Sequence, residues 1–438
     1  MPTLPIAARL GAGLLTIPVF AAGTTATASI PEGGRLVGAS IHVATTGSDA
    51  NPGTAAKPLR TIQKAVDRSG PGAKILVHKG TYNQQISITH SGTARAPITL
   101  TAAGDGPVKL TSVQPATKCS SMKPTSDRTI LVKGGADYWT ISGLQIHNGV
   151  YINGGGGFDA FTWTDSLVDK RNWQERRRVP GTSTNDPEVS KGAIAYVESK
   201  IGRTLNPADG IQLIGNTVTG RGIHATLARS GLIQDNTITR VDCGTGPGIW
   251  VLTFSTFWRI TGNDVSHIAD ASTNHYMQEG IRLGTSSNYN RIDNNYVHDL
   301  GDDGRGFATD VDASFNIFEN NLVRDVPVGY NDEMSGWGNV WRNNRADRYT
   351  TIAFGFRMKD RELTLPSKDT STHYSIVTNN VATNPKGSTA YGLGIGAIAG
   401  STFSGNRLGR VVLGKYLKGY WAKQGNTWNG TTRPPSNS

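Results

Sequence analysis

Hydrophobic and polar residues alternate along this chain in short runs, and most of these runs end near an asparagine. An alternation with a period of two is typical of β-strands, whereas helices repeat their hydrophobic positions every three to four residues. The clearest stretch extends from Gly280 to Asn344, where three such units follow one another. The recurring asparagines are Asn216, Asn236, Asn263, Asn295, Asn321, Asn344, Asn380 and Asn406. The steps between them are 20, 27, 32, 26, 23, 36 and 26 residues.

A repeat of this length with short strands is typical of the coils of a parallel β-helix. One coil cannot bury its hydrophobic edge alone, so successive coils stack and share a continuous core. Asparagine suits the recurring turn because it tolerates a left-handed backbone and bonds nearby main-chain groups. At a coil spacing of about 4.8 Å, such amides form a ladder. We therefore predict an all-β solenoid in which these asparagines are structural.

The repeat is interrupted or closed at a few places. Residues Leu59 to Val66 have hydrophobic side chains at helical spacing, which predicts a short helix that covers the amino-terminal end of the core. An insert at about 154–208 is either a loop that lines a binding groove or a packing insert. A smaller insertion runs from Asp360 to Thr372. We expect a single β-helix domain over 29–432 and a disordered tail at 433–438.

Residues 1–28 contain Arg9, a hydrophobic run and the ending Ala26-Thr27-Ala28, which together predict a signal peptide and a secreted, extracellular protein. No later run is long and hydrophobic enough to cross a membrane. The two cysteines, Cys119 and Cys243, either form one disulfide or stay as two buried thiols, and they match no metal-binding motif.

The formal net charge of +11 favours an acidic partner. Nucleic acid, an anionic polysaccharide and a cell wall all satisfy this condition, but no helix-turn-helix or zinc-finger pattern supports the first. We therefore expect a monomer that acts on an anionic polysaccharide, with neither nucleic acid nor membrane as a partner.

The amino-terminal region resembles a known group of proteins. Residues 47–54 read Gly-Ser-Asp-Ala-Asn-Pro-Gly-Thr, residues 57–65 read Lys-Pro-Leu-Arg-Thr-Ile-Gln-Lys-Ala, and residues 80–82 read Gly-Thr-Tyr. With Ser91 to Thr99, this text is similar to the cap of secreted bacterial right-handed parallel β-helix proteins of the pectate lyase-like superfamily. That group includes family 9 pectate lyases and some β-helix glycosidases. The resemblance covers about residues 40–110 and implies the fold, while one cap serves several reactions.

The register of the repeat predicts which side chains share the outer face. Around Phe307 the hydrophobic residues are expected to point inward, which turns Asp310 and Asp312 outward. Moving one coil at a time gives two adjoining outer columns. One column is Trp250, Arg282, Ala308, Asn331 and Arg357, and the other is Leu252, Gly284, Asp310, Glu333 and Lys359. This strip of mixed charge is either a groove for an acidic sugar or a solvated face with cross-strand ion pairs.

The strip contains the groups needed for β-elimination from a uronic acid. This reaction requires a base and a cation that neutralises the sugar carboxylate. We expect Lys359 to be the base and Arg282 or Arg357 to bind the carboxylate, with Asp310 and Glu333 completing the catalytic set. The residues expected to bind substrate are Trp250, Asn331, Arg305 and His224.

A calcium ion is the expected cofactor, because carboxylate oxygens are its preferred ligands. The run Asp302-Asp303-Gly304-Arg305 resembles the Asp-Asp-Gly-x-Asp calcium run of family 9 pectate lyases, although Gly306 stands in place of the last aspartate. The expected ligands are Asp302, Asp303, Asp310 and Asp312.

Two other functions use the same strip. If Asp310 and Glu333 stack on adjacent coils, their separation would be near the ~5 Å of retaining glycosidases, which predicts glycoside hydrolysis by paired carboxylates. A non-catalytic carbohydrate-binding β-helix would not depend on these charges. We favour a lyase over a hydrolase, and both over a binding protein.

Overall fold

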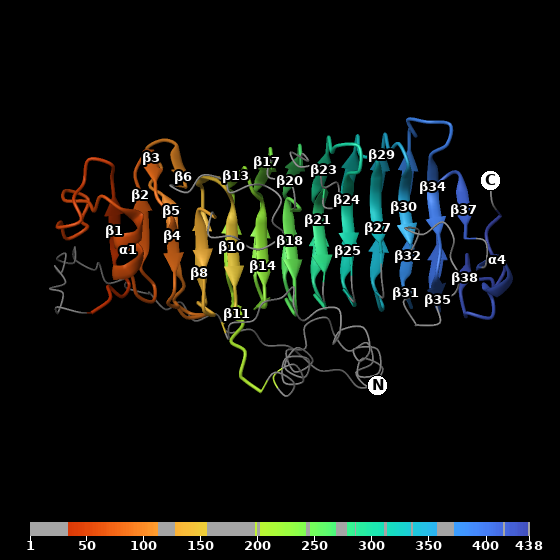
Figure 1. Ribbon diagram of the computed structural model, residues 1–438, viewed down its shortest axis with the longest axis horizontal. Coiled ribbons are helices and arrows are strands. Elements are labelled where there is room, and N and C mark those ends of the chain that lie inside the picture. Colours follow the sequence, from red (N-terminus) through yellow and green to blue (C-terminus); the bar gives the residue numbers. More distant parts are fainter. Residues whose placement is uncertain are drawn as a thin grey trace, which may run out of the picture. The chain divides into compact units, whose positions relative to one another are not determined.

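The computed structural model describes residues 34–112, 128–155, 198, 202–241, 246–268, 278–284, 286–310, 313–333, 336–356, 372–414 and 417–436. The chain from Arg35 to Ser438 forms one compact unit. Its strands build a right-handed parallel β-helix, in which each coil contributes one strand to each of several long sheets (Figure 1). The predicted fold class is confirmed.

Three long sheets and two short ones are present in the described part of the chain, and within each sheet the strands follow one another in sequence order. The 13-stranded sheet contains β1 (Ser40–Val43), β2 (Lys74–Val77), β5 (Ile98–Ala102), β8 (Trp139–Ser142), β12 (Gln212–Ile214), β16 (Leu232–Gln234), β19 (Arg259–Thr261), β22 (Arg291–Asp293), β25 (Ile317–Glu319), β28 (Val340–Arg342), β32 (Ile376–Thr378), β36 (Thr402–Ser404) and β38 (Thr427–Trp428). The 11-stranded sheet contains β4 (Ile86–Ile88), β7 (Ile130–Val132), β10 (Val150–Asn153), β14 (Ile223–Thr226), β18 (Ile249–Leu252), β21 (Glu279–Gly284), β24 (Arg305–Thr309), β27 (Val328–Asp332), β30 (Ile352–Phe356), β34 (Tyr391–Ile395) and β37 (Val411–Leu413). The 10-stranded sheet contains β3 (Gly80–Asn83), β6 (Val108–Thr111), β9 (Gln145–His147), β13 (Thr217–Thr219), β17 (Thr237–Thr239), β20 (Asp264–Ser266), β23 (Tyr296–His298), β26 (Leu322–Arg324), β29 (Arg345–Asp347) and β33 (Val381–Thr383). The two-stranded sheets pair β11 (Ala208–Asp209) with β15 (Ala228–Arg229) and β31 (Thr372–His373) with β35 (Ile398–Ala399).

A short helix covers the amino-terminal end of the core. This helix, α1 (Ile62–Arg68), begins after Thr61, whose side chain accepts a hydrogen bond from the backbone N–H of Lys64 at 3.2 Å. Such a bond satisfies one of the N–H groups that a helix start leaves unpaired. The hydrophobic side of α1 is buried against β1, β2 and β4. The predicted capping helix is therefore present. It ends at Arg68, two residues after the expected end at Val66.

The core is lined by columns of inward side chains, as the alternation predicted. On the 11-stranded sheet, Phe307, Tyr330 and Phe354 stack ring on ring, with centroids 5.1 and 4.6 Å apart. On the 13-stranded sheet, Phe318 and Trp341 stack at 4.0 Å. All five side chains are buried, so each coil packs its hydrophobic residues directly on those of the next.

The recurring asparagines form the expected ladder. The side-chain amide of Asn295 donates to the Oδ1 atom of Asn321 at 3.0 Å, and that of Asn321 donates to Asn344 at 3.1 Å. The amide of Asn321 also donates to the backbone carbonyl of Ile292 at 2.9 Å. The same side-chain bonds join all neighbours in the series Asn216, Asn236, Asn263, Asn295, Asn321, Asn344, Asn380 and Asn406.

One detail of the turn differs from the expectation. The left-handed backbone lies at the residue before the ladder asparagine, as at Asn294 (φ 58°) and Asn320 (φ 56°). Other coils place a glycine there, for example Gly215 and Gly262. The two positions therefore have separate tasks: the first supplies an unusual backbone angle, and the second supplies the amide that bonds the next coil.

A second ladder was not predicted. It joins Asn290, Asn316 and Asn339 through side-chain amides, with distances of 3.0 Å and 3.3 Å. These residues precede β22, β25 and β28, so this ladder supports the entry into the 13-stranded sheet.

At the carboxyl end, α4 (Leu417–Tyr420) is followed by Trp421, which is 1% exposed. The indole ring of Trp421 lies 5.9 Å from the ring of Phe403. Pro435 is also buried, although 433–438 had been expected to form a disordered tail.

Several expectations fall outside the described residues. These are the signal peptide at 1–28, both Cys119 and Cys243, most of the insert at 154–208 and nearly all of the insertion at 360–372. Among the helices that the structure describes, none has the length and hydrophobicity to cross a membrane.

Candidate active site

Four strands of the 11-stranded sheet align the predicted outer column. Trp250 of β18 pairs with Arg282 of β21, Arg282 pairs with Ala308 of β24, and Ala308 pairs with Asn331 of β27. The next partner of Asn331 is Gly355 rather than the expected Arg357, so this part of the column was wrong. The expectation used a step of 26 residues, whereas the strands are 24 residues apart because the extra residues of this coil follow β30. Arg357 and Lys359 lie outside the described residues.

We call five residues the charged cluster: Glu279, Arg282, Arg305, Asp310 and Glu333. Glu279 and Arg282 belong to β21 and Arg305 begins β24, while Asp310 and Glu333 directly follow β24 and β27. Arg282 makes ion pairs with Glu279 through Nη1 and with Asp310 through Nη2. Arg305 Nη1 lies 3.0 Å from Glu279 Oε1 and 2.9 Å from Glu333 Oε1. The structure thus brings together four residues that sequence analysis had assigned to the site, and it adds Glu279.

The members of the charged cluster differ in their access to solvent. The side chains of Glu279, Glu333 and Arg282 are 0%, 2% and 6% exposed, whereas those of Asp310 and Arg305 are 19% and 23% exposed. Charges buried this deeply are tolerated only when they are paired. The buried members therefore form a rigid support, and Asp310 and Arg305 are the groups that a ligand meets first.

The electrostatic surroundings favour different protonation behaviour for Glu333 and Arg282. Burial raises the pKa of Glu333, and the nearby guanidinium groups of Arg282 and Arg305 oppose this effect only in part. Burial also works against the charge of Arg282, but the carboxylates of Glu279, Asp310 and Glu333 outweigh it and raise the pKa of Arg282. Arg282 is therefore a permanent cation that holds carboxylates, and it does not act as a base.

Asn331 supports the cluster from β27. Its side-chain amide donates to Glu333 Oε1 at 3.0 Å, the same oxygen that Arg305 contacts. Asn331 is 7% exposed, so its expected role in binding substrate is less direct than that of Arg305.

Glu279 was missed because the simple alternation does not hold at its position. Alternation places Glu279 on the same side as the inward Ile281, yet Glu279 contacts the outward Arg282. Gly280 lies between Glu279 and Ile281, and a Cβ there would come within 2.3 Å of Val297. A glycine recurs at this corner in successive coils, at Gly248, Gly280, Gly306 and Gly329. This repeated glycine is the signal that could have warned of a break in the strand pattern.

His224 and Trp250 extend the strip from Arg282 toward the amino-terminal coils. The guanidinium of Arg282 lies 6.0 Å from the centroid of the Trp250 ring, and the His224 ring meets Trp250 edge to face at 5.1 Å. Arg128 Nη2 lies 3.1 Å from His224 Nδ1. Burial, together with Arg128 and Arg221, holds the pKa of His224 well below its ordinary value, so this ring is neutral at ordinary pH.

The aspartates expected to bind calcium do not form one group. Asp302 and Asp303 are exposed and precede β24, whereas Asp310 follows it, and a five-residue strand spans about 16 Å. Asp312 lies outside the described residues. In the described part of the chain, no group of three or more His, Cys, Asp or Glu side chains is suited to hold a metal ion. The carboxylates of the charged cluster face arginines instead, so these residues do not fit calcium.

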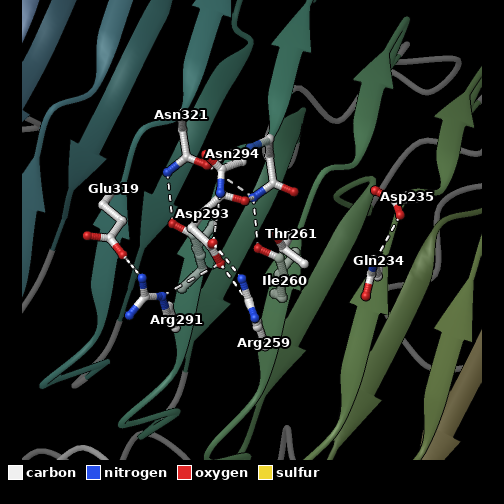
Figure 2. A network of polar contacts seen from close by, with 12 residues as sticks. Gln234, Asp235, Arg259, Ile260, Thr261, Arg291, Asp293, Asn294, Glu319 and Asn321 are labelled. Atoms are coloured by element: carbon white, nitrogen blue, oxygen red, sulfur yellow. Dashed lines mark hydrogen bonds and ion pairs between the residues drawn. The ribbon is translucent and has the colours of Figure 1, made fainter.

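A second ionic network lies on the 13-stranded sheet (Figure 2). Arg259 Nη2 lies 3.1 Å from Asp293 Oδ2, and Glu319 makes ion pairs with Arg291 and Arg342. Here the three arginines are 43–56% exposed. Such pairs on an open face stabilise the stacking of coils only modestly, and they provide matched controls for the charged cluster.

Comparisons with known proteins agree with this architecture. Residues 41–186 match the family model described as "Pel9A-like, right handed beta helix region". The chain is 26% identical to pectate lyase PEL9 of Emericella nidulans over 335 residues, which cover 73% of this chain and 76% of the relative.

Two solved structures share the fold at low sequence identity. The xylose complex of XylC is 13% identical and covers 85% of this chain and 86% of its own, with a TM-score of 0.50. The family 28 exopolygalacturonase of Yersinia enterocolitica is 14% identical and covers 90% and 79%, also with a TM-score of 0.50. The family match, the relative and the stacked parallel sheets lead to the same conclusion. Residues 41–186 are similar to a Pel9A-like region, and the chain as a whole resembles the right-handed parallel β-helix proteins of the pectate lyase-like superfamily.

Proposed function

We propose that this protein is a carbohydrate-active enzyme that cleaves an acidic, uronate-containing polysaccharide by β-elimination at the charged cluster. The observation that carries the proposal is the position of Arg305. Its Nη1 atom is held by Glu279 and Glu333, while its side chain remains 23% exposed. A guanidinium that is anchored by carboxylates and remains partly exposed is suited to bind a sugar carboxylate. Similarity to a pectate lyase supports the same reaction class.

In this reaction, Arg305 binds the uronate carboxylate and stabilises the negative charge that grows on it. A base removes the proton from the carbon next to the carboxylate. The electron pair of that C–H bond forms the carbon–carbon double bond, the bond to the glycosidic oxygen breaks, and that oxygen takes up a proton. Lys359 is our proposed base, and Asp310 is the most exposed carboxylate of the charged cluster.

The other members of the charged cluster position these groups. Arg282 joins Glu279 to Asp310, and Glu279 in turn contacts Arg305. This arrangement fixes the two exposed groups before a substrate arrives, and such preorganisation lowers the cost of reaching the transition state.

Glycoside hydrolysis is a second candidate, and a specific observation favours it. The pKa of Glu333 is raised by burial, which suits a general acid, and Asp310 lies in the same cluster as a second carboxylate. A protonated carboxyl group beside an ionised one is the arrangement that glycosidases use.

Product analysis separates these candidates. Purified protein is incubated with pectate, alginate, glucuronan and neutral glycans, each with and without a chelator. A lyase forms new reducing ends together with an unsaturated product that absorbs ultraviolet light, whereas a hydrolase forms reducing ends alone. Loss of activity with the chelator would show that cleavage requires a divalent cation, which the described carboxylates do not indicate. No cleavage of any glycan, combined with binding, would favour the non-catalytic alternative.

The substitution Arg305→Gln tests whether Arg305 binds the sugar carboxylate. We expect it to reduce kcat/KM on the cleaved acidic glycan by roughly 100-fold or more, because a hydrogen bond between two charged groups is worth up to about 3 kcal/mol. The matched control is Arg342→Gln, which removes an arginine that pairs with a carboxylate on another sheet. Equal activity of the two variants would exclude Arg305 as the carboxylate-binding group.

A further inference from the structure

Two histidines and an aspartate lie end to end on three successive coils near the amino terminus, on a sheet that does not carry the charged cluster. His42 belongs to β1, His78 directly follows β2, and Asp105 lies in the turn after β5. His42 Nδ1 lies 3.0 Å from His78 Nε2, and His78 Nδ1 lies 2.9 Å from Asp105 Oδ2. We refer to these three residues as the histidine chain.

The contacts determine where the protons lie. His78 Nδ1 lies 2.9 Å from Asp105 Oδ2, and a carboxylate oxygen is the acceptor in such a contact. The N–H of His78 is therefore on Nδ1, and its Nε2 carries a lone pair directed at His42. The ring centroids are 5.3 Å apart, which places the rings edge to edge with the two nitrogens facing each other. The pair is thus held together by one proton, donated by His42 Nδ1.

A proton shared by two imidazole nitrogens occupies a place that a transition metal can take. Imidazole nitrogens bind Zn²⁺, Ni²⁺ and Cu²⁺ at about 2.0 Å. The two nitrogens are 3.0 Å apart, so a metal about 2.0 Å from each of them makes a nitrogen–metal–nitrogen angle of about 95°. To bind it, the two rings pivot until their lone pairs point at the metal. That angle suits neighbouring positions of a square-planar or octahedral ion, which favours Cu²⁺ and Ni²⁺. The proton on His42 moves to Nε2, so the exchange of tautomers releases no proton.

Asp105 supplies a further feature of such sites. Histidines that bind metals commonly donate their other N–H to a carboxylate, which fixes the ring and strengthens the nitrogen as a ligand. His78 has this contact with Asp105, and the backbone N–H of Lys79 donates to the other oxygen of Asp105 at 2.9 Å, which holds the carboxylate in place.

We propose that the histidine chain binds one divalent transition-metal ion, with Cu²⁺ or Ni²⁺ preferred, through His42 Nδ1 and His78 Nε2, and with water completing the coordination. The ion would join the first and second coils of the solenoid. Because an ion that binds only the folded state stabilises it, the metal should also raise the melting temperature. This site is independent of the proposed catalytic function.

Calorimetric titration of the full chain, without a histidine tag, with CuCl₂, NiCl₂ and ZnCl₂ at pH 7 tests the proposal. We expect one ion per chain, with Cu²⁺ bound more tightly than Ni²⁺ or Zn²⁺. Either His42→Gln or His78→Gln should abolish this binding, and Asp105→Asn should weaken it by about 10- to 100-fold. The electron paramagnetic resonance spectrum of the Cu²⁺ form should show coupling to two imidazole nitrogens.

The control is His147→Gln, which removes an exposed histidine on the 10-stranded sheet and should leave binding unchanged. Circular dichroism and thermal melting without metal establish that each variant is folded. The proposal is overturned if the folded His42→Gln and His78→Gln variants bind Cu²⁺ as the unsubstituted chain does, or if none of the three metals binds to the unsubstituted chain.

Discussion

At the scale of single residues, Asp332 shows how the surroundings set a charge. It is the last residue of β27, is 0% exposed and faces the core. Its carboxyl group accepts hydrogen bonds from the Thr309 hydroxyl at 2.9 Å and from the Asn339 amide at 3.3 Å. These bonds offset burial only in part, and burial raises the pKa of Asp332 to about 6. The folded protein therefore favours the protonated form of this side chain.

This shift predicts a pH dependence of stability. Below about pH 4, Asp332 is protonated in both the folded and the unfolded chain, so it does not lower the free energy of unfolding. As the pH rises through 6, the folded state must bury a carboxylate, and the free energy of unfolding falls by about 3 kcal/mol in total because of Asp332. Urea denaturation from pH 4 to pH 7 should show this loss in the natural chain and not in Asp332→Asn.

The control for this comparison is Asp302→Asn, which alters an exposed aspartate and should leave the pH dependence as it is. Parallel stability curves for the natural chain and Asp332→Asn would contradict the raised pKa.

At the scale of the element, the asparagine ladder offers a comparison between neighbours. Asn321→Ala should cost about 3 to 5 kcal/mol, because it leaves the backbone N–H and the side-chain amide of Asn295 without their acceptor. Asn320→Gly should change stability by less than about 1 kcal/mol, because Asn320 supplies a left-handed backbone that glycine adopts freely. Chemical denaturation of both variants measures the difference, and equal losses would show that the two positions are not specialised.

The same regularity explains how much of the site could be predicted from sequence. The pairing of Trp250, Arg282 and Asn331 with their neighbours follows from a constant coil spacing and a period of two within strands. These rules fail where the backbone turns a corner, so Glu279 beyond Gly280 was missed. They also fail beside an insertion, where the count of residues per coil no longer locates the strand, as with Arg357.

Coordinates are also needed to judge local sequence motifs and to find contacts between residues that are distant in the sequence. The Asp302-Asp303 run resembles a calcium motif in sequence, but the strand that follows separates it from Asp310. His42 and His78 are 36 residues apart in a region without the repeated asparagine, so no register rule indicated their contact.

At the scale of the whole molecule, every internal coil is supported by a neighbour on each side, whereas the end coils have only one. Trp421→Ala should therefore loosen the carboxyl end first. Removing this buried ring from beside Phe403 should cost about 3 to 5 kcal/mol. Hydrogen exchange should show faster exchange in β36 and β38 while the strands near β21 stay protected.

A matched substitution in the middle of the solenoid, Trp341→Ala, provides the comparison. It removes a ring of the same size, stacked on Phe318, and should destabilise the surrounding coils on both sides rather than one end. Identical exchange patterns for the two variants would argue against unfolding from the ends.

The charged cluster draws its members from consecutive turns of the solenoid, while the asparagines that hold those turns together lie elsewhere on each turn. The residues proposed to bind substrate and the residues that hold the coils together thus occupy different positions of the same repeat. A turn could be exchanged for one with different outward groups, provided its asparagine and its corner glycine are kept. Such a scaffold can acquire a new specificity one turn at a time without having to reinvent its architecture.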